Sequence, residues 1–301
     1  MRNSVDVVIP MQLNSNFTLL YPVQVDWEKF TAYRPDIPFS DEVIEFLNIL
    51  SGGILKDRNS RLYPDVITFA FFCRKANLQK LKGEYVHEEL RLGRGVLFHI
   101  APSNVPINFG YSLVAGLLSG NINIVRVSSK QFPQVDLIIK HLHEILKSEL
   151  YDEVASRIVL VRYDRTSDAN AYFSSIANVR VIWGGDTTIA TIRQSALPAR
   201  SFDVCFADRY SIAAINPTAI ISATDVEMKR LAEAFYNDTY LFDQNACSAP
   251  HTIFWLSADC LEAAKDRFWN TFHDYVLSKY QLQAVMSVDK LTAFYLSLIH
   301  I

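Results

Sequence analysis

Cysteine is scarce in this chain, and the few cysteines are not arranged in pairs. The 301 residues include four of them, Cys73, Cys205, Cys247 and Cys260, which are widely spaced and form no Cys-x-x-Cys motif. A disulfide framework needs closely spaced cysteines in a small secreted chain, and a structural zinc site needs ligand pairs a few residues apart. We therefore expect neither disulfides nor a metal site, and the cysteine content fits a reducing compartment.

Long apolar runs and an excess of charge of one sign are also missing. No uninterrupted apolar stretch approaches the roughly 18 to 20 residues that a membrane-spanning helix needs. The first residues, with Asp6 and Pro10, lack the pattern of a secretory signal. The formal net charge is only −3, with both signs mixed along the chain, so neither nucleic acid nor an anionic membrane surface is an expected partner. We expect a cytoplasmic protein without a membrane span.

What the sequence does contain is enough apolar material for a large core. With 50% apolar and 20% charged residues, the chain is long enough for one large or two ordinary domains. From Gly95 onward, short apolar runs alternate with longer amphipathic ones. This alternation predicts strands at 96–101, 122–127, 158–161, 179–183 and 202–206, and helices at 107–118, 135–150, 168–177 and 187–195. Such an order predicts an α/β fold with a parallel sheet covered on both faces, which is a nucleotide-binding architecture in outline.

The two ends of the chain follow other patterns. Residues 1 to about 60 are rich in proline, asparagine and polar residues, and we expect an N-terminal arm there. The predicted elements outside the alternating region are helices at 40–50 (with Ser40 as its cap), 64–81, 225–240 and from about 258, and strands at 211–215, 220–222 and 252–256. We therefore expect two domains, residues 1–209 with the arm and a dinucleotide-binding domain, and residues 210–301 with a second α/β domain.

A dinucleotide site would have to differ from the usual one. No Gly-x-Gly-x-x-Gly follows the first predicted strand, where the chain reads Pro102-Ser103-Asn104-Val105-Pro106. After the strand that ends at 182 comes Trp183-Gly184-Gly185-Asp186-Thr187-Thr188, where two glycines permit a tight turn and a helix start offers free N–H groups. A plain strand-to-helix turn is the alternative interpretation of that segment.

A second group of polar donors follows the strand at 122–127. Arg126, Ser128, Ser129 and Lys130 lie at the carboxyl end of that strand, where open α/β sheets bind ligands, and an arginine offers a planar fork suited to a ribose phosphate. The residues that we predict to contact a dinucleotide are Arg126, Ser128, Gly184, Gly185, Asp186 and Thr187.

Cys247 is the cysteine with the most favourable surroundings for chemistry. It lies in Asp243-Gln244-Asn245-Ala246-Cys247-Ser248-Ala249-Pro250, where small residues and a proline break regular structure between a predicted helix and a strand. A cysteine thiolate can attack a carbonyl, and a loop asparagine can donate to the oxyanion that forms. Cys73 and Cys205 fit buried hydrophobic positions better, and Cys260 is ambiguous. Spacing alone leaves a structural role for Cys247 open.

Together, these motifs resemble the aldehyde dehydrogenase superfamily. The resemblance rests on the order and spacing of 102–106, Gly120-Asn121 with Arg126 and Ser128, Gly184-Gly185, and Gln244 with Cys247. Within the superfamily, the chain is similar to the acyl-CoA reductase (LuxC-type) family known from bacterial bioluminescence, over roughly residues 90–260. The resemblance implies a nucleotide-binding domain followed by an α/β catalytic domain that is shortened at its C-terminal end relative to the family.

The resemblance also implies roles for individual residues. Cys247 would be the nucleophile that accepts the acyl group, and Asn104 would supply the amide of the oxyanion hole. Arg126 falls where many aldehyde dehydrogenases have a lysine near the adenosine ribose. An arginine that faces a 2′-phosphate there would favour NADPH over NADH.

One departure from the superfamily pattern points to the direction of the reaction. Hydrolytic aldehyde dehydrogenases have a general base in a Glu-Leu-Gly-Gly segment, but residues 197–215 of this chain contain no glutamate and only Asp203 and Asp208 as acids. Without a base to activate water, an acyl-enzyme would survive long enough to be reduced. The expected reaction is NADPH-dependent reduction of a fatty acyl-CoA, or another acyl thioester, to the aldehyde through a cysteinyl thioester.

Two other functions remain open from the sequence. One is an NAD(P)-dependent aldehyde dehydrogenase, and the other is a non-catalytic fragment or acyl-carrying subunit, because the chain ends at Leu298-Ile299-His300-Ile301 where family members continue. We expect the 301-residue chain alone to bind acyl groups or nucleotide poorly. The expected partners of the whole protein are an acyl thioester, an acyl-transferring protein and further copies of itself.

Overall fold

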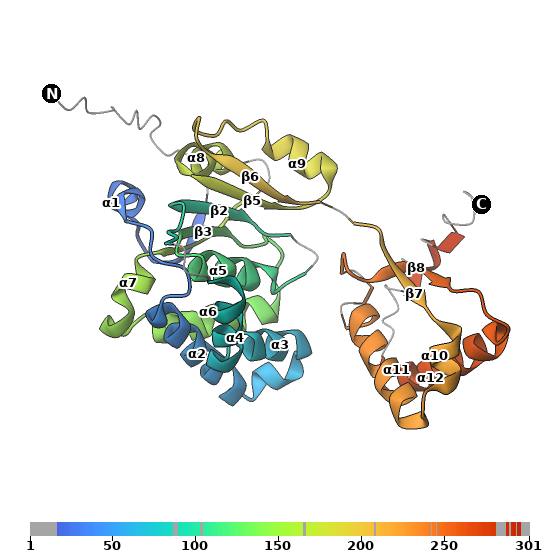
Figure 1. The fold of residues 1–301 in the computed structure, drawn as a ribbon. Helices are drawn as coiled ribbons and strands as arrows, with labels where there is room; N and C mark the ends of the chain where they lie inside the picture. The colour runs from blue at the N-terminus through green and yellow to red at the C-terminus, as the bar shows by residue number, and fades with distance from the viewer. Residues whose placement is uncertain are drawn as a thin grey trace. The chain divides into compact units, whose positions relative to one another are not determined.

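The computed structural model describes residues 17–86, 90–102, 105–164, 167–207, 209–241, 243–244, 246–280, 287–288, 290–292 and 294–295. The chain divides into two compact units, residues 1–208 (unit 1) and 209–301 (unit 2) (Figure 1).

Unit 1 is built on a six-stranded sheet with the order β1-β4-β3-β2-β5-β6. The strands are β1 (Thr18–Tyr21), β2 (Val96–Ile100), β3 (Ile122–Arg126), β4 (Ile158–Arg162), β5 (Val179–Trp183) and β6 (Phe202–Phe206). β2 to β6 run parallel, which confirms the predicted α/β fold, whereas β1 pairs antiparallel with β4. The sequence did not predict β1, because four residues before a proline are too short to show an alternating pattern.

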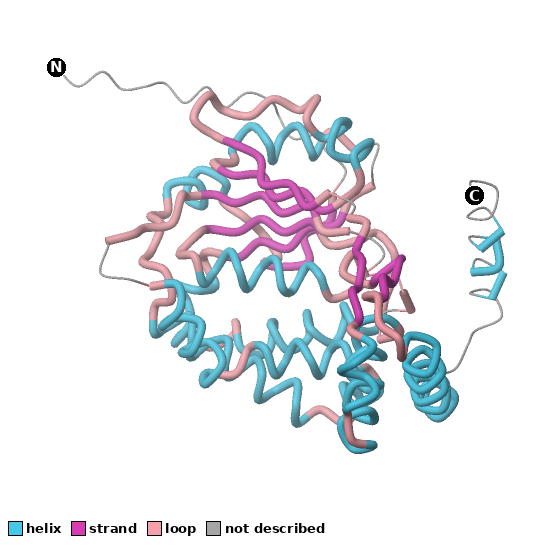
Figure 2. The backbone as a smooth tube through the Cα atoms, turned by 45° about the vertical axis from the view of Figure 1, so that its right-hand side comes forward, coloured by secondary structure: helices cyan, strands magenta, loops and turns pink. Residues whose placement is uncertain are grey.

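Helices cover the two faces of this sheet. The helices of unit 1 are α1 (Trp27–Ala32), α2 (Asp41–Lys56), α3 (Pro64–Phe72), α4 (Lys75–Tyr85), α5 (Asn108–Leu118), α6 (Pro133–Ile145), α7 (Asp152–Ala155), α8 (Ala169–Ile176) and α9 (Asp186–Ile192), with 3₁₀ turns η1 (Asn59–Leu62) and η2 (Glu149–Tyr151). In Figure 1, α5 and α6 lie on one side of the sheet, and α8 and α9 lie on the other. Figure 2 shows the strands enclosed between these helices.

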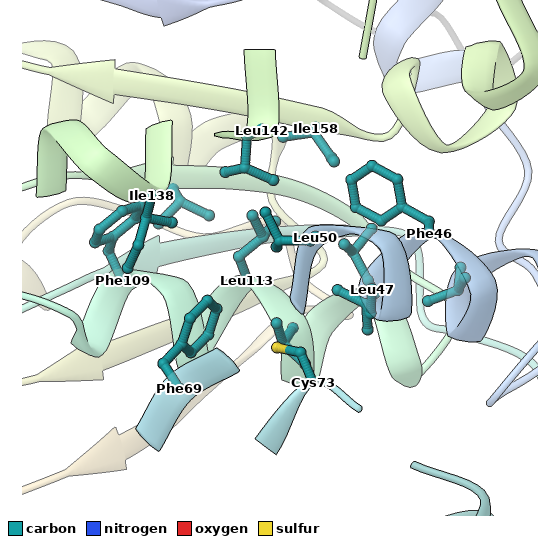
Figure 3. Close-up of a cluster of buried hydrophobic side chains, with 14 of the residues drawn as sticks. Phe46, Leu47, Leu50, Phe69, Cys73, Phe109, Leu113, Ile138, Leu142 and Ile158 are labelled. Atoms are coloured by element: carbon teal, nitrogen blue, oxygen red, sulfur yellow. The ribbon is translucent and has the colours of Figure 1, made fainter. Parts of the chain in front are cut away.

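The larger core cluster fills the side of α2, α3, α5 and α6. Figure 3 shows side chains from these helices meeting the strands, among them Phe46 and Leu50 of α2, Phe109 of α5 and Leu142 of α6. The opposite side is closed by a second cluster around Phe173 of α8. Burying one such side chain contributes about 2 kcal/mol, so the sheet is held firmly from both faces.

Two N-terminal helices differ from the sequence prediction. The helix expected at 40–50 continues to Lys56, and Ser40 is its N-cap residue but makes no side-chain capping hydrogen bond. The single helix expected at 64–81 is two helices, α3 and α4, because Arg74 adopts an extended conformation and Asn77 Nδ2 donates to the free Phe72 carbonyl at 2.8 Å. These breaks depend on side-chain contacts that periodicity does not register.

Over its described residues, unit 2 includes a small parallel sheet and several helices. Its elements are β7 (Ser211–Ile215), α10 (Pro217–Ser222), α11 (Asp225–Thr239), β8 (Pro250–Trp255) and α12 (Leu261–Lys279). β7 pairs parallel with β8, and Ile220, Met228, Ala264 and Phe268 form the buried centre of this unit.

The strand predicted at 220–222 was wrong, because these residues belong to helix α10. Asn216 caps that helix by accepting a hydrogen bond from the Thr218 amide at 3.0 Å, and Pro217 occupies its first turn, where a proline is favoured. The start signal is therefore present in the sequence, but the apolar Ile220 and Ile221 imitate a buried strand.

A series of hydrogen-bonded side chains crosses the core of unit 1 beside α5. The Trp183 indole N–H donates to Ser112 Oγ (3.2 Å), Ser112 Oγ lies 2.8 Å from His99 Nδ1, and His99 Nε2 lies 3.0 Å from Asn123 Oδ1. Asn123 Nδ2 in turn donates to the Asn121 carbonyl at 2.8 Å. Asn123 therefore offers its oxygen to a His99 Nε2–H, and Nδ1 accepts the Ser112 hydroxyl. Burial lowers the pKa of His99 to about 4, although the hydrogen bond with Asn123 opposes this shift.

The neutral state of His99 predicts a pH dependence of stability. Because the pKa is about 4 in the folded protein and 6.5 ordinarily, the unfolded chain binds more protons between these values, and the free energy of unfolding must rise with pH across that window. The full contribution of a shift of this size is about 3 kcal/mol. Between pH 4 and 7, the free energy of unfolding measured with urea should rise less in His99→Gln than in the wild type, by that amount. The exposed His273→Gln is the control, and equal slopes in wild type and His99→Gln would contradict the prediction.

Candidate functional site

A cavity of about 550 Å³ opens in unit 1 at the carboxyl ends of β2, β3 and β5. The strand order changes direction between β2 and β5, since β3 and β4 extend to one side of β2, and β5 and β6 to the other. Open α/β sheets bind ligands at such a point. The lining residues are Ile100, Ala101, Pro102, Arg126, Ser128, Ser129, Lys130, Asn170, Trp183, Gly184, Gly185, Thr187, Thr188, Thr191 and Ile192.

Five of the six residues predicted to contact a dinucleotide line this cavity. Arg126 and Ser128 do so from the end of β3, and Gly184, Gly185 and Thr187 from the turn into α9. Asp186 begins α9 but is exposed and is not among the lining residues. The parallel sheet thus brings together segments that are about 60 residues apart in the sequence, since one contains Arg126 and the other Gly184.

Arg126 is the most distinctive polar group of the lining. One of its terminal nitrogens donates to the Tyr163 carbonyl at 3.3 Å, and the guanidinium carbon lies 5.0 Å from the centroid of the Tyr163 ring. Its Nε is buried and has no hydrogen-bond partner within the described part of the chain. The Tyr163 hydroxyl donates to Oδ1 of Asn170 at 2.6 Å, which orients a second lining residue. Arg126 therefore brings a positive charge to a cavity whose described lining also contains Lys130 but no carboxylate.

The turn from β5 into α9 is shaped by close packing. A Cβ atom on Gly184 would lie 3.0 Å from Cγ2 of Thr188, so a larger residue would push against the first turn of the helix. Gly185 is the N-cap residue of α9, a helix of only seven residues. Trp183, which precedes the two glycines, stacks its ring on that of Phe206, with the ring centroids 3.9 Å apart. The glycines bring backbone close to the cavity, while the cations supply its charge.

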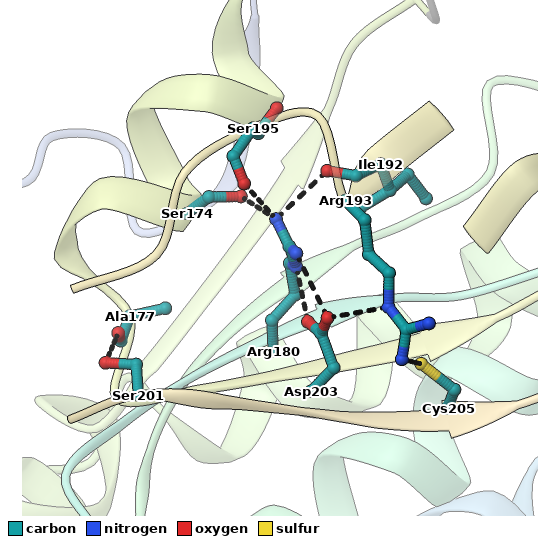
Figure 4. A network of polar contacts seen from close by, with 9 residues as sticks. All are labelled: Ser174, Ala177, Arg180, Ile192, Arg193, Ser195, Ser201, Asp203 and Cys205. Carbon is teal, nitrogen blue, oxygen red and sulfur yellow. Dashed lines mark hydrogen bonds and ion pairs between the residues drawn. The ribbon is translucent and has the colours of Figure 1, made fainter. Parts of the chain in front are cut away.

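A buried arginine holds the cavity wall in place. Arg180 of β5 is 1% exposed, and Figure 4 shows its guanidinium surrounded by acceptors. It donates to both carboxylate oxygens of Asp203 (2.8 and 3.3 Å), to Ser174 Oγ (2.9 Å), and to the carbonyls of Ile192 (3.1 Å) and Ser195 (2.9 Å). These bonds join β5 to β6, α8 and the end of α9. Sequence reasoning missed this pair, although a charged residue within each of two apolar strand segments is a usable signal.

Asp203 is committed to this network. Burial opposes its ionisation, but hydrogen bonds from Arg180 and Arg193 and their positive charges outweigh that effect and lower the pKa of Asp203. A carboxylate with a lowered pKa and two arginine partners is a poor proton acceptor. Of the two acids that the sequence offered as alternatives to a glutamate base, Asp203 is thus structural, and Asp208 lies outside the described residues.

Cys247 lies in unit 2, in the loop between α11 and β8, and it is exposed. Its carbonyl accepts a hydrogen bond from Ser211 Oγ at 2.7 Å, which fixes the loop to the start of β7. Of the other thiols, Cys205 and Cys260 are half-buried and Cys73 is buried, where desolvation raises the pKa of its thiol. Cys247 is the most accessible of the four. Asn104, the predicted oxyanion donor, lies outside the described residues.

Among the residues that the structure describes, no group of three or more His, Cys, Asp or Glu side chains could hold a metal ion. No helix in the described segments is long and apolar enough to cross a membrane.

Comparison with known proteins assigns the family. The model of the acyl-CoA reductase (LuxC) family matches residues 74–266, which is more than half of the chain. The chain belongs to this family. This confirms the resemblance seen in the sequence motifs. One relative of this chain is the long-chain acyl-protein thioester reductase 2 of Photobacterium leiognathi, which is 22% identical over 267 residues, or 84% of this chain and 52% of the relative.

Solved structures show the same fold. An oxidoreductase from Marinobacter aquaeolei matches with a TM-score of 0.57 at 12% identity over 83% of this chain and 54% of the other. Lactaldehyde dehydrogenase from Escherichia coli matches with a TM-score of 0.51 at 13% identity over 78% of this chain and 51% of the other. The fold is therefore that of the aldehyde dehydrogenases, and this LuxC-family chain spans about half the length of the relatives it matches.

The Arg180 network predicts a large loss of stability when one partner is removed. Asp203→Asn keeps the shape of the side chain but leaves the buried guanidinium without its counter-charge, which should lower the free energy of unfolding by about 3 to 5 kcal/mol in urea titrations. Arg193→Met removes only the exposed partner of Asp203 and should cost at most about 1 kcal/mol. A loss below 1 kcal/mol for Asp203→Asn would show that the pair does not hold the wall.

Proposed function

We propose that the protein is the reductase part of a fatty acyl thioester reductase, with Cys247 as nucleophile and NADPH as reductant. The observation that carries the proposal is the membership of the LuxC family together with two features that this chemistry needs. These are an exposed cysteine in a loop of unit 2 and a cation-lined cavity at the strand ends of unit 1. Because the chain spans about half the length of its relatives, the activity is proposed for the whole protein.

The chain's own residues suggest how the thioester is handled. The Cys247 thiolate attacks the carbonyl carbon of the acyl thioester, the bond to the CoA sulfur breaks, and CoA leaves as the thiolate. Asn104 is proposed to donate its amide N–H to the oxyanion during this attack. A nicotinamide cofactor, when bound, supplies the hydride that converts the Cys247 thioester to the aldehyde and frees the cysteine thiolate. Because Asp203 is held between two arginines, it does not compete by activating water for hydrolysis.

The cavity of unit 1 fits a phosphorylated dinucleotide. Its volume of about 550 Å³ lies within the range of cofactor sites. Sites for NAD use an acidic residue on the ribose hydroxyls, whereas an arginine accommodates the additional phosphate of NADP. The described lining has two cations, Arg126 and Lys130, and no carboxylate. This composition supports NADPH over NADH.

The alternative functions are distinguished by the substrates that are turned over. An NAD(P)-dependent aldehyde dehydrogenase would oxidise aldehyde with NAD alone, whereas the proposed reductase requires acyl thioester and NADPH. A non-catalytic acyl carrier would be acylated but would release no aldehyde when NADPH is added.

The acylation step can be tested directly on this chain. Incubation with a saturating fatty acyl-CoA should add the mass of one acyl group to the intact protein, and peptide mapping should place it on Cys247. Cys247→Ser should carry no stable thioester, while Cys260→Ser, the control, should acylate as the wild type does. A covalent product accumulates even when binding is weak, so a wild-type protein that stays unmodified would refute the proposed nucleophile.

The cofactor preference can be tested through Arg126. Because a charge-assisted hydrogen bond contributes roughly 1.5 to 3 kcal/mol, Arg126→Gln should weaken NADPH binding by about 10- to 100-fold while NADH binding changes little. Isothermal titration with both cofactors measures the ratio. Arg58→Gln, an exposed arginine away from the lining, makes the same charge change and serves as control. An equal loss for both cofactors would contradict a 2′-phosphate contact.

A further inference from the structure

The Cys247 loop begins with two residues in the left-handed region of backbone space. Asp243 has φ 51° and Gln244 has φ 62°. Residues other than glycine rarely adopt this conformation, so two in succession need contacts that hold them there. The end of α11 supplies some, because the Asp243 amide donates to the Tyr240 carbonyl (3.0 Å) and the Gln244 amide to the Thr239 carbonyl (2.8 Å). The chain therefore leaves the helix in a fixed direction toward Cys247.

Lys290 binds both left-handed residues. Its Nζ forms an ion pair with Asp243 Oδ1 at 3.1 Å, and it donates to the Asp243 carbonyl at 3.4 Å and to Gln244 Oε1 at 2.5 Å. An ammonium group has three N–H donors, which matches these three acceptors. The contact joins positions more than 40 residues apart and fixes the turn from outside the loop.

Two tyrosines complete this group of contacts. The Tyr280 hydroxyl donates to Asp243 Oδ1, and its ring packs edge-on against that of Tyr240, with centroids 4.7 Å apart. Lys290 Nζ lies 5.6 Å from the Tyr240 centroid and 5.9 Å from the Tyr280 centroid, within the range of cation–π attraction. The Lys290 side chain is only 28% exposed. Its ammonium is thus held by a carboxylate, two oxygens and two aromatic rings.

We propose that Lys290 is a positioning residue for Cys247, supported by Tyr280. The inference rests on the proposed function, in which Cys247 is the acyl-accepting nucleophile. Cys247 follows Gln244 by three residues, and Ser211 fixes its carbonyl on the other side. The thiol is thus carried by a short segment held at both ends. Without Lys290, the turn loses its external contacts, and the sulfur loses its direction of approach to the thioester carbonyl.

The test compares an oriented reaction of Cys247 with an unoriented one. In Lys290→Met, the rate of Cys247 acylation by fatty acyl-CoA should fall by about tenfold or more, because small displacements of a reacting group are costly. Alkylation of Cys247 by iodoacetamide, a small reagent without a binding site, should change less than twofold. Lys290→Arg should restore most of the acylation rate. Lys279→Met, on the last turn of α12, is the matched control and should leave both rates unchanged.

Tyr280→Phe provides a second variant that keeps the ring and removes only the hydroxyl, and its acylation rate should fall about threefold or more. Acylation of Lys290→Met and Tyr280→Phe at the wild-type rate would overturn the inference while leaving Cys247 as nucleophile. Equal losses of acylation and alkylation, or no rescue by Lys290→Arg, would assign Lys290 a general structural role and would also overturn it. Absence of acylation in the wild type would refute the proposed function itself.

Discussion

The candidate cofactor site depends on one buried charge and the acceptors that compensate it. An arginine that is 1% exposed cannot remain charged without partners, since the cost of an uncompensated buried ion is several kcal/mol. Arg180 meets this requirement with Asp203, Ser174 and two backbone carbonyls, which come from four different parts of unit 1. The need to satisfy one guanidinium therefore fixes α8, the end of α9 and β6 around β5. α8, α9 and the end of β5 each line part of the cavity, so this constraint fixes that part of its wall.

The same ion pair bears on the chemistry. β6, the edge strand of the sheet, carries one acid. Its acid, Asp203, points into the Arg180 network and is held ionised by two arginines. The residues of β6 that remain are Phe202, Val204, Cys205 and Phe206, none of which is a carboxylate. Asp203 therefore has a structural use, and under the proposed function it would not serve as a base that activates water.

Much of this architecture could be predicted from the sequence, and the failures have identifiable causes. β5 and β6 have the predicted bounds, because short apolar runs that follow amphipathic helices leave little choice. Arg126 and Gly184 lie in one cavity because the carboxyl ends of parallel strands meet at one edge, which follows from topology alone.

Side-chain contacts could not be predicted in this way. The break between α3 and α4 and the cap of α10 each depend on one asparagine. Asn170 and Thr191 line the cavity from helices, and their direction is set by how α8 and α9 pack on the sheet. The contact of Lys290 with Gln244 spans more than 40 residues and follows no periodicity.

The two units hold their candidate functional groups by different means. In unit 1, strand ends emerge from a sheet with a large core on each face, so backbone position is determined by packing. In its described residues, unit 2 has a two-stranded sheet and a smaller buried centre, and two strands alone are marginally stable. Under the proposed function, the Cys247 loop presents its thiol in one direction, and local polar contacts would have to hold it. The left-handed pair at 243–244, held by Lys290 and Tyr280, meets that requirement where the core does not reach.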